Sequence, residues 1–309
     1  MLKVIELFGG IGACSKALSN LNIEFEIVDY VEINKYAVKS FNAIHNTNFE
    51  PQDIRKWNKK IDVDLIMHGS PCQDFSLAGK QAGGDKGSGT RSSLMYETVR
   101  IVESLKPKYV IWENVKNLLS KKHKHNFDNY INSLNDIGYN SYYQVLNAKD
   151  YGIPQRRERV FTVSIRKDID KSSFLFPEKE ELKLKLKDLL EDNVDEKYYL
   201  SDEQINKLKV NSEQQKLLIK NATKLGYIEA EAGDSINLER PDSKTRRGRV
   251  GKQISQTLTA SDNMAVAVGD CIILNYPSTH KNRLSQGMAR TLTTDGFAQG
   301  VFTDWESED

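Results

Sequence analysis

The sequence contains few cysteines and no long hydrophobic run. Its three cysteines, Cys14, Cys72 and Cys271, are scattered over 309 residues, which argues against a disulfide framework or a CxxC metal site and is typical of a reducing compartment. No apolar run approaches membrane-spanning length, and the N-terminal stretch enters a glycine turn without the apolar core of a signal peptide. These absences predict a soluble, cytoplasmic protein without a bound metal.

An excess of charge of one sign is also absent. The chain carries 44 Lys+Arg and 43 Asp+Glu, for a formal net charge of +1. Such a chain is no bulk polycation, so any surface for nucleic acid must come from the local placement of basic residues. With 39% hydrophobic residues, the chain can form one large domain or two unequal ones.

Short apolar runs alternate with amphipathic stretches in the first half of the chain. Strands and helices that alternate at this spacing predict crossover connections and a parallel sheet. We therefore expect an α/β fold with a doubly wound, mostly parallel sheet. The expected strands are 3–8, 25–33, 63–70, 107–115, 142–148 and 159–165, and the expected helices include 12–21, 93–105 and 126–139.

Composition changes after the α/β region, which we place at 1–175. Residues 176–225 are rich in Lys and Glu with helical periodicity, and we interpret them as a charged helical connector with a solvated face. In 226–309, short β-branched runs are separated by Gly, Asn and Asp, which predicts a smaller β-rich or irregular region.

A glycine-rich turn, FGGIG at 8–12, follows the first expected strand and precedes a helix. Glycines there let a ligand approach the main chain and the helix N-terminus, although such a turn also occurs for packing alone. Glu32 ends the second strand, where a carboxylate can hold the ribose of a nucleoside cofactor or simply sit at a helix N-terminus. The two features together favour the nucleoside site. Asp53 is a weaker signal by itself.

Cys72, in the stretch MHGSPCQDFSLAG at 67–79, has three candidate roles: core thiol, metal ligand or nucleophile. It follows an expected parallel strand at the edge where open α/β sheets place their binding crevice. Glu113 ends the next strand at the same edge, and a carboxyl there can act as a general acid toward a bound base. Arg156, Arg157 and Arg159 flank another strand at this edge. This context favours the nucleophile.

Six segments, taken in order, resemble the motifs of the DNA (cytosine-5) methyltransferase family of bacterial and phage restriction-modification type. They cover roughly residues 3–165, and their order makes the resemblance specific although no single motif decides it. The segments are FGGIG, VEINKYA, DI, GSPCQDFSLAGK, RIVESLKPKYVIWENVKNL and LNAKDYGIPQRRERVF.

The resemblance implies a catalytic and cofactor-binding domain in 1–175 that uses S-adenosylmethionine. The glycine turn would contact the cofactor, Glu32 its ribose, and Asp53 with Ile54 its adenine. The implied cofactor-binding residues are Phe8, Gly9, Gly10, Ile11, Gly12, Glu32, Ile33, Asp53, Ile54, Pro71 and Leu94.

The resemblance also implies covalent catalysis on a cytosine that is flipped out of double-stranded DNA. Cys72 would attack C6, Glu113 would hydrogen-bond and protonate N3, and Arg157 with Arg159 would orient the base. Carbon 5 would then accept the methyl group, and loss of its proton would expel the cysteine.

DNA contacts are implied in two regions. The segment 76–93 fits a mobile loop that closes over flipped DNA, although an ordinary flexible loop is the alternative, and 226–309 would be the target-recognition region. The implied DNA-binding residues are Gln73, Ser76, Lys80, Arg91, Arg246, Arg247 and Arg249.

Two segments that usually follow in the family, RxLTxxE and a QxGNS-like helix, are not found; RTLTTDG at 290–296 lacks the acidic residue. A second subunit that supplies them, a truncated chain and a divergent terminus are the three explanations. The alternative functions are a catalytically incomplete DNA-binding subunit and an RNA cytosine-5 methyltransferase. A dinucleotide-dependent oxidoreductase is disfavoured because the first turn lacks GxGxxG.

Overall fold

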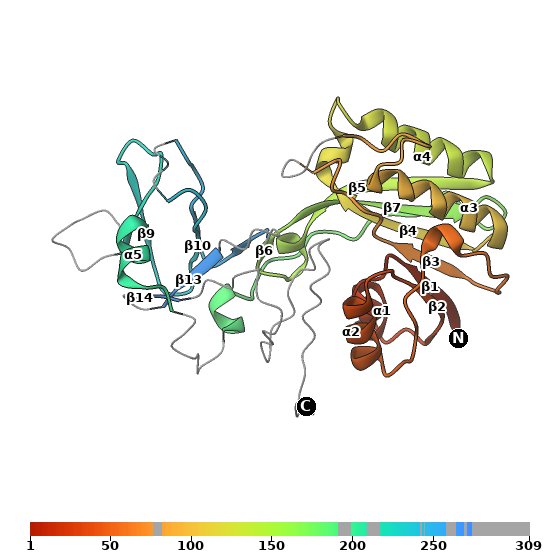
Figure 1. The fold of residues 1–309 in the computed structure, drawn as a ribbon, viewed down its shortest axis with the longest axis horizontal. Coiled ribbons are helices and arrows are strands. Elements are labelled where there is room, and N and C mark those ends of the chain that lie inside the picture. Colours follow the sequence, from red (N-terminus) through yellow and green to blue (C-terminus); the bar gives the residue numbers. More distant parts are fainter. Residues whose placement is uncertain are drawn as a thin grey trace. The chain divides into compact units, whose positions relative to one another are not determined.

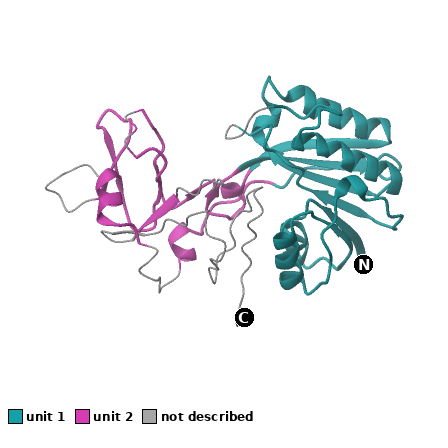
Figure 2. Ribbon diagram, viewed as in Figure 1, with its two compact units in different colours: residues 1–146, 158–177, 294–309 teal, residues 147–157, 178–293 magenta. Residues whose placement is uncertain are grey.

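The structure is a computed structural model (Figure 1). It describes residues 1–76, 82–190, 199–208, 217–241, 243, 245–257, 264–268 and 271–273. The chain forms two compact units (Figure 2): unit 1 contains residues 1–146 and 158–177, and unit 2 contains residues 147–157 and the described part of 178–293.

Unit 1 is built on a six-stranded sheet with the order β2-β1-β3-β4-β7-β5. The first four strands in this order run parallel to one another, and β7 runs antiparallel to β4. This arrangement confirms the α/β fold expected from the sequence. The strands are β1 (Leu2–Leu7), β2 (Phe25–Val31), β3 (Leu65–His68), β4 (Tyr109–Val115), β5 (Tyr139–Asn147) and β7 (Glu158–Arg166).

Helices cover both faces of this sheet (Figure 1). On one face Val4 and Met67 pack with Leu18 of α1, and on the other Ile66 packs in a cluster with Ile101 of α3. Burial on both faces explains why these strands are nearly continuous apolar runs. The helices of unit 1 are α1 (Ala13–Asn20), α2 (Lys35–His45), α3 (Met95–Leu105) and α4 (Lys124–Asp136), with the 3-10 turns η1 (Ile54–Lys56), η2 (Arg91–Leu94) and η3 (Lys116–Leu119).

Unit 2 is rich in short strands, as the sequence predicts for its C-terminal part. One sheet has the order β11-β10-β13-β14, and two further pairs are β8-β9 and β12-β6. Leu217, Ile219 and Ile236 lie in its apolar core. Its elements are η4 (Ala148–Tyr151), β6 (Gln155–Arg156), η5 (Leu186–Leu189), α5 (Asp202–Leu208), β8 (Leu217–Lys220), β9 (Tyr227–Ala230), β10 (Ser235–Asn237), β11 (Val250–Gly251), β12 (Ser255–Gln256), β13 (Met264–Val268) and β14 (Cys271–Ile273).

The compact units differ from the regions predicted at 1–175, 176–225 and 226–309. Residues 147–157 belong to unit 2, because Gln155 and Arg156 of β6 pair in parallel with β12. The predicted helical connector contains only short helical segments in its described part, and 178–185 has none. Its LKLKLK pattern alternates every second residue, which does not give a helix one apolar face.

Among the described residues, no helix combines the length and the apolar character needed to cross a bilayer.

Candidate active site

Sheet register places the predicted site residues of unit 1 in one row. Leu7 pairs with Val31 and with His68, and His68 pairs with Trp112. The residues that follow these four are Phe8, Glu32, Gly69 and Glu113. They therefore lie side by side at the carboxyl edge of four parallel strands, the edge at which open α/β sheets bind ligands.

The glycine turn after β1 has an unusual backbone. Phe8, Gly10 and Gly12 all have positive φ, at 54°, 56° and 84°, and such a conformation is strained for a bulky residue like Phe8. A Cβ at Gly9 would lie 2.5 Å from the ring of Tyr30, while the Tyr30 hydroxyl donates to Gly10 O at 2.5 Å. Packing against β2 thus requires glycine at position 9.

Glu32 connects the end of β2 to this turn. Its Oε2 accepts a hydrogen bond from Gly10 N at 3.3 Å, and its Oε1 accepts one from Asn34 N at 2.8 Å. The carboxylate is half-buried, and each oxygen can accept a further bond. Ile33 beside it is 62% exposed. A carboxylate next to an exposed apolar side chain and a glycine turn suits the ribose and purine of a nucleoside.

The predicted adenine-contacting residues lie at η1. Asp53 caps η1 by accepting from Arg55 N at 3.0 Å and pairs with the Arg55 guanidinium at 2.6 Å; this hydrogen-bonded guanidinium holds the pKa of Asp53 below its usual range. Ile54 is buried in the main core of unit 1. Arg100 of α3 donates to Ile54 O and to Trp57 O, both at 2.9 Å, so a helix more than 40 residues further along the chain fixes this loop.

Pro71 and Leu94, the remaining predicted cofactor residues, are each half-buried. Leu94 ends η2 and packs against the main core. Ile11 is likewise half-buried in the glycine turn.

Cys72 lies in a tight turn just after β3. Its carbonyl oxygen accepts from Phe75 N at 2.9 Å and from Ser76 N at 2.8 Å. Two residues before it, Ser70 O and Ser70 Oγ accept from Asn114 Nδ2 at 3.3 and 3.4 Å. The nucleophile candidate is therefore held between its own turn and the end of β4.

Glu113 and Arg159 meet beside this turn. Arg159 Nε lies 2.9 Å from Glu113 Oε1, and a Cβ on Gly69 would lie 3.8 Å from Glu113 Oε2. The side chain of Glu113 is 30% exposed and that of Arg159 is 16% exposed. Unit 1 thus brings the carboxylate, one of the two predicted arginines and the start of the Cys72 loop to one place.

Cys14 offers a comparison with Cys72. Burial, followed by the nearby carboxylates of Glu6 and Glu113, raises the pKa of the Cys14 thiol well above its usual range. A thiol under these conditions stays protonated and is a poor nucleophile. The sequence position of Cys72 and the electrostatics of Cys14 both favour Cys72 as the reactive thiol.

Arg157 belongs to unit 2, directly before the chain enters β7. Its backbone N donates to Asn147 Oδ1 at 3.1 Å, and its carbonyl accepts from Ala148 N at 3.0 Å. Arg156, its neighbour in β6, is exposed. The backbone at Arg157 is therefore tightly held within unit 2.

The predicted DNA-binding residues of unit 1 flank the loop after Cys72. Gln73 and Ser76 are half-buried in the Cys72 turn, Arg91 is exposed, and Lys80 lies outside the described residues. Asp74 and Ser92 close the base of the loop with two reciprocal hydrogen bonds of 3.1 Å.

The three predicted arginines of unit 2 have different environments. Arg247 is exposed, whereas Arg246 pairs with Glu239 at 2.9 Å. Arg249 is fully buried, and its guanidinium donates to Asn237 O at 3.1 Å and Arg240 O at 3.0 Å. Arg249 therefore supports the backbone of unit 2 instead of facing a phosphate, which corrects the sequence prediction for this residue.

Sequence reasoning missed two supporting residues. They are Asn114 and Arg100, to which the sequence patterns assigned no role. Both contacts join residues more than 40 positions apart in the chain. The only available signal was that each residue lies inside a motif that resembles the family.

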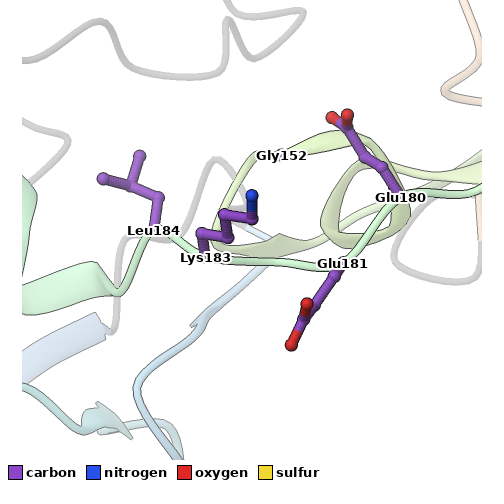
Figure 3. Close-up of a pocket in the computed structure, with 5 residues that line it drawn as sticks. All are labelled: Gly152, Glu180, Glu181, Lys183 and Leu184. Carbon is purple, nitrogen blue, oxygen red and sulfur yellow. The ribbon is translucent and has the colours of Figure 1, made fainter.

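Unit 2 contains an open cavity of about 400 Å³ lined by Gly152, Glu180, Glu181, Lys183 and Leu184 (Figure 3). None of these residues is among those predicted for catalysis or cofactor binding. Three of its five lining residues are charged, and Figure 3 shows the Glu180 and Glu181 carboxylates pointing in different directions. The cavity is a surface hollow without a converging set of catalytic groups.

The chain is similar to known proteins over much of its length. The family model for C-5 cytosine-specific DNA methylases matches residues 2–301. The type II methyltransferase M2.ScrFI of Lactococcus lactis subsp. cremoris is 37% identical, with 67% of this chain and 72% of that protein covered. The orphan methyltransferase M.SPRI of Bacillus phage SPR is also 37% identical over 67% of this chain, and the chain spans 54% of its length.

A solved structure supports the fold over a longer stretch. A putative DNA modification methyltransferase encoded within an Escherichia coli prophage has a TM-score of 0.58 to this chain, with 20% sequence identity and coverage of 88% of this chain and 86% of that one. At this identity the likeness concerns the fold.

Proposed function

Because the chain belongs to the C-5 cytosine-specific DNA methylase family, we propose that it methylates carbon 5 of cytosine within a specific DNA sequence, with S-adenosylmethionine as the methyl donor. The observation that carries this proposal is the row at the carboxyl edge of the sheet. The glycine turn, Glu32, the Cys72 loop and Glu113 stand there on adjacent strands, so a nucleoside cofactor and a base can meet.

The residues of unit 1 fit the cofactor. S-adenosylmethionine supplies an electrophilic methyl group when bound. We propose that Glu32 accepts hydrogen bonds from its ribose hydroxyls, that the 8–12 turn contacts it through the main chain, and that Asp53 and Ile33 contact its adenine side. The place of the turn at the carboxyl edge of the sheet and the two oxygens of Glu32 support this assignment.

The proposed chemistry is nucleophilic catalysis on a flipped-out cytosine. Cys72 Sγ forms a bond to C6 while Glu113 donates a proton to N3, which makes C5 nucleophilic enough to take the methyl group. Loss of the C5 proton to solvent then restores the C5–C6 double bond and breaks the bond to Cys72, while N3 returns its proton to Glu113. Arg159, paired with Glu113, orients the carboxyl group and stabilises negative charge as the adduct forms.

The DNA contacts are a further part of the proposal. We assign phosphate or base contacts to Gln73, Ser76, Lys80, Arg91, Arg246 and Arg247, and a base-orienting role to Arg157. Arg249 is left out because it is buried. A cytoplasmic location, which the sequence predicts, would give the chain access to cellular or phage DNA.

A direct test uses methyl transfer and covalent trapping together. The 309-residue chain is incubated with labelled S-adenosylmethionine and unmethylated mixed-sequence DNA, and in parallel with DNA that contains 5-fluorocytosine. We expect transfer, and an adduct that resists denaturation. Cys72→Ser should lose both, while Cys14→Ser, which removes the other thiol of unit 1, should still form the adduct.

The same assay separates the remaining explanations. A folded chain that binds DNA but neither transfers methyl nor forms an adduct would support a DNA-binding subunit that needs a second chain, and a candidate partner would then be added. Transfer to RNA in place of DNA would contradict the proposed substrate.

A further inference from the structure

The segment SKKHKH at 120–125 connects η3 to α4, and neither the motifs nor the proposed chemistry assigns it a role. We propose that this cationic turn, defined as residues 120–125, binds the phosphate backbone of the DNA substrate close to the flipped base. The inference rests on the proposed function, because it takes duplex DNA to be the partner.

Charge of one sign is concentrated here. Lys121, Lys122, Lys124 and His125 are all exposed, and residues 116–125 contain four lysines and no acidic residue. Lys124 pairs with Asp128 at 2.5 Å on the next turn of the helix, and His125 Nε2 lies 3.0 Å from Asp85 Oδ1. In a chain with a net charge of only +1, such a local group is what a polyanion-binding surface requires.

The turn places these cations where a helix disfavours them. α4 begins at Lys124, has no acidic residue in its first turn and has no side-chain cap. The N-terminus of a helix carries partial positive charge, so lysines there are unfavourable unless negative charge lies nearby. Burial and then the charges of Lys122 and His125 lower the pKa of His123, a sign of the positive potential in the turn.

Two buried polar atoms give a second, independent observation. Ser120 Oγ and His123 Nε2 have no hydrogen-bond partner among the described residues, although buried polar atoms in folded proteins almost always have one. This short segment thus has cations at a helix N-terminus and buried polar atoms without a hydrogen-bond partner, and both features are unfavourable for stability. Such departures are expected at functional sites.

Contacts within unit 1 link the turn to the nucleophile. The ring of His123 packs edge-on against Phe75, with centroids 5.4 Å apart, and Asn117 Nδ2 donates to Phe75 O at 2.6 Å. Phe75 N in turn donates to Cys72 O at 2.9 Å. A phosphate at Lys121 or Lys122 would therefore lie next to the base of the loop that follows Cys72.

Salt dependence of DNA binding tests the proposal. Affinity for an unmethylated mixed-sequence duplex is measured over a range of salt concentrations, with S-adenosylhomocysteine present, for the wild type and for Lys121→Gln/Lys122→Gln. Each lysine that contacts a phosphate contributes about 1 to the slope of log affinity against log salt. We expect the slope of the double variant to be shallower by about 2, with unchanged affinity for S-adenosylhomocysteine.

The matched control is Lys167→Gln/Lys171→Gln. Both lysines are exposed in unit 1 and follow β7 at the opposite edge of the sheet, since Ile165 pairs with Tyr109 at the start of β4. This variant has the same change in charge and should keep the wild-type slope. Thermal unfolding of both variants verifies that they fold.

Each other result overturns the inference. A wild-type slope in Lys121→Gln/Lys122→Gln would show that the turn does not contact DNA. An equal decrease of the slope in both double variants would show that the effect comes from net charge and not from the turn. Trapping of 5-fluorocytosine DNA by the wild type reports the proposed function separately, so a trapping enzyme with an unchanged slope rejects the cationic turn alone. A wild type that neither binds nor traps DNA rejects both.

Discussion

Arg159 Nε and Glu113 Oε1 lie 2.9 Å apart, across the antiparallel strands β4 and β7. Val115 is the register partner of Arg159, so Arg159 reaches Glu113 along the same face, two residues along the partner strand. The pair exists before any base is bound. A cytosine that enters the site therefore meets a carboxyl group whose orientation is already set.

Replacing Arg159 tests this preorganisation. We expect Arg159→Gln to slow methyl transfer at saturating DNA by about 10²-fold, since removal of one preorganised charged donor costs ~3 kcal/mol. Arg159→Lys keeps the charge but loses the fixed guanidinium geometry, and should recover only part of the rate. Single-turnover kinetics measure the effect, and a wild-type rate in Arg159→Gln would contradict the role of the pair.

Asn114 is expected to position the Cys72 loop. Asn114→Ala removes the hydrogen bonds to Ser70 O and Ser70 Oγ, so it should lower the free energy of unfolding by about 1–3 kcal/mol and slow formation of the covalent adduct more than it weakens DNA binding. Asn129→Ala, at an exposed position of α4, is the control. Equal effects on adduct formation from both variants would argue against a specific role for Asn114.

Arg100 is expected to support cofactor binding without touching the cofactor. Arg100→Gln loses the bonds to Ile54 O and Trp57 O, and we expect about tenfold weaker binding of S-adenosylmethionine, or ~1.4 kcal/mol. Glu97→Gln removes only the pairing with Arg100 Nε and should have a smaller effect. Equilibrium dialysis gives both dissociation constants; identical values for wild type and Arg100→Gln would exclude this positioning role.

Glu6 should make stability depend on pH. It is 1% exposed, and burial raises its pKa from 4.5 to about 7. Between these values the folded state holds a proton that the unfolded state releases, so Glu6 lowers the free energy of unfolding as pH rises from 4.5 to 7, by up to about 3 kcal/mol. Glu6→Gln keeps an oxygen that can accept from Ser15 N and should remove this loss.

His68 makes stability change with pH in the opposite direction from Glu6. Burial lowers its pKa from 6.5 to about 3, so its contribution is complete above pH 6.5 and is lost as pH falls toward 3. The two residues therefore offset each other between pH 4.5 and 6.5 in the wild type. Urea unfolding of Glu6→Gln across this range should reveal a rise in stability with pH, and the same profile in both proteins would contradict the assignment to Glu6.

Much of unit 1 follows from local sequence. Apolar strands alternate with amphipathic helices along the chain, and parallel strands with crossovers bring their carboxyl ends to one edge. The positions of Glu32 and Glu113 at that edge follow from motif spacing alone. The predicted helical connector is a counterexample, because its residues 178–185 contain no helix although their composition favours one.

Local sequence thus determined the α/β fold, the family and the placement of Cys72, Glu32 and Glu113 at strand ends, because each depends on residues close together in the chain. Tertiary structure decided the rest. Strand register and contacts between segments distant in sequence decide three features: the Arg159–Glu113 pair, the hydrogen bonds from Asn114 to Ser70, and the burial of Arg249. A linear pattern marks an arginine as basic, but only packing decides whether its guanidinium meets a carboxylate, a carbonyl group or solvent.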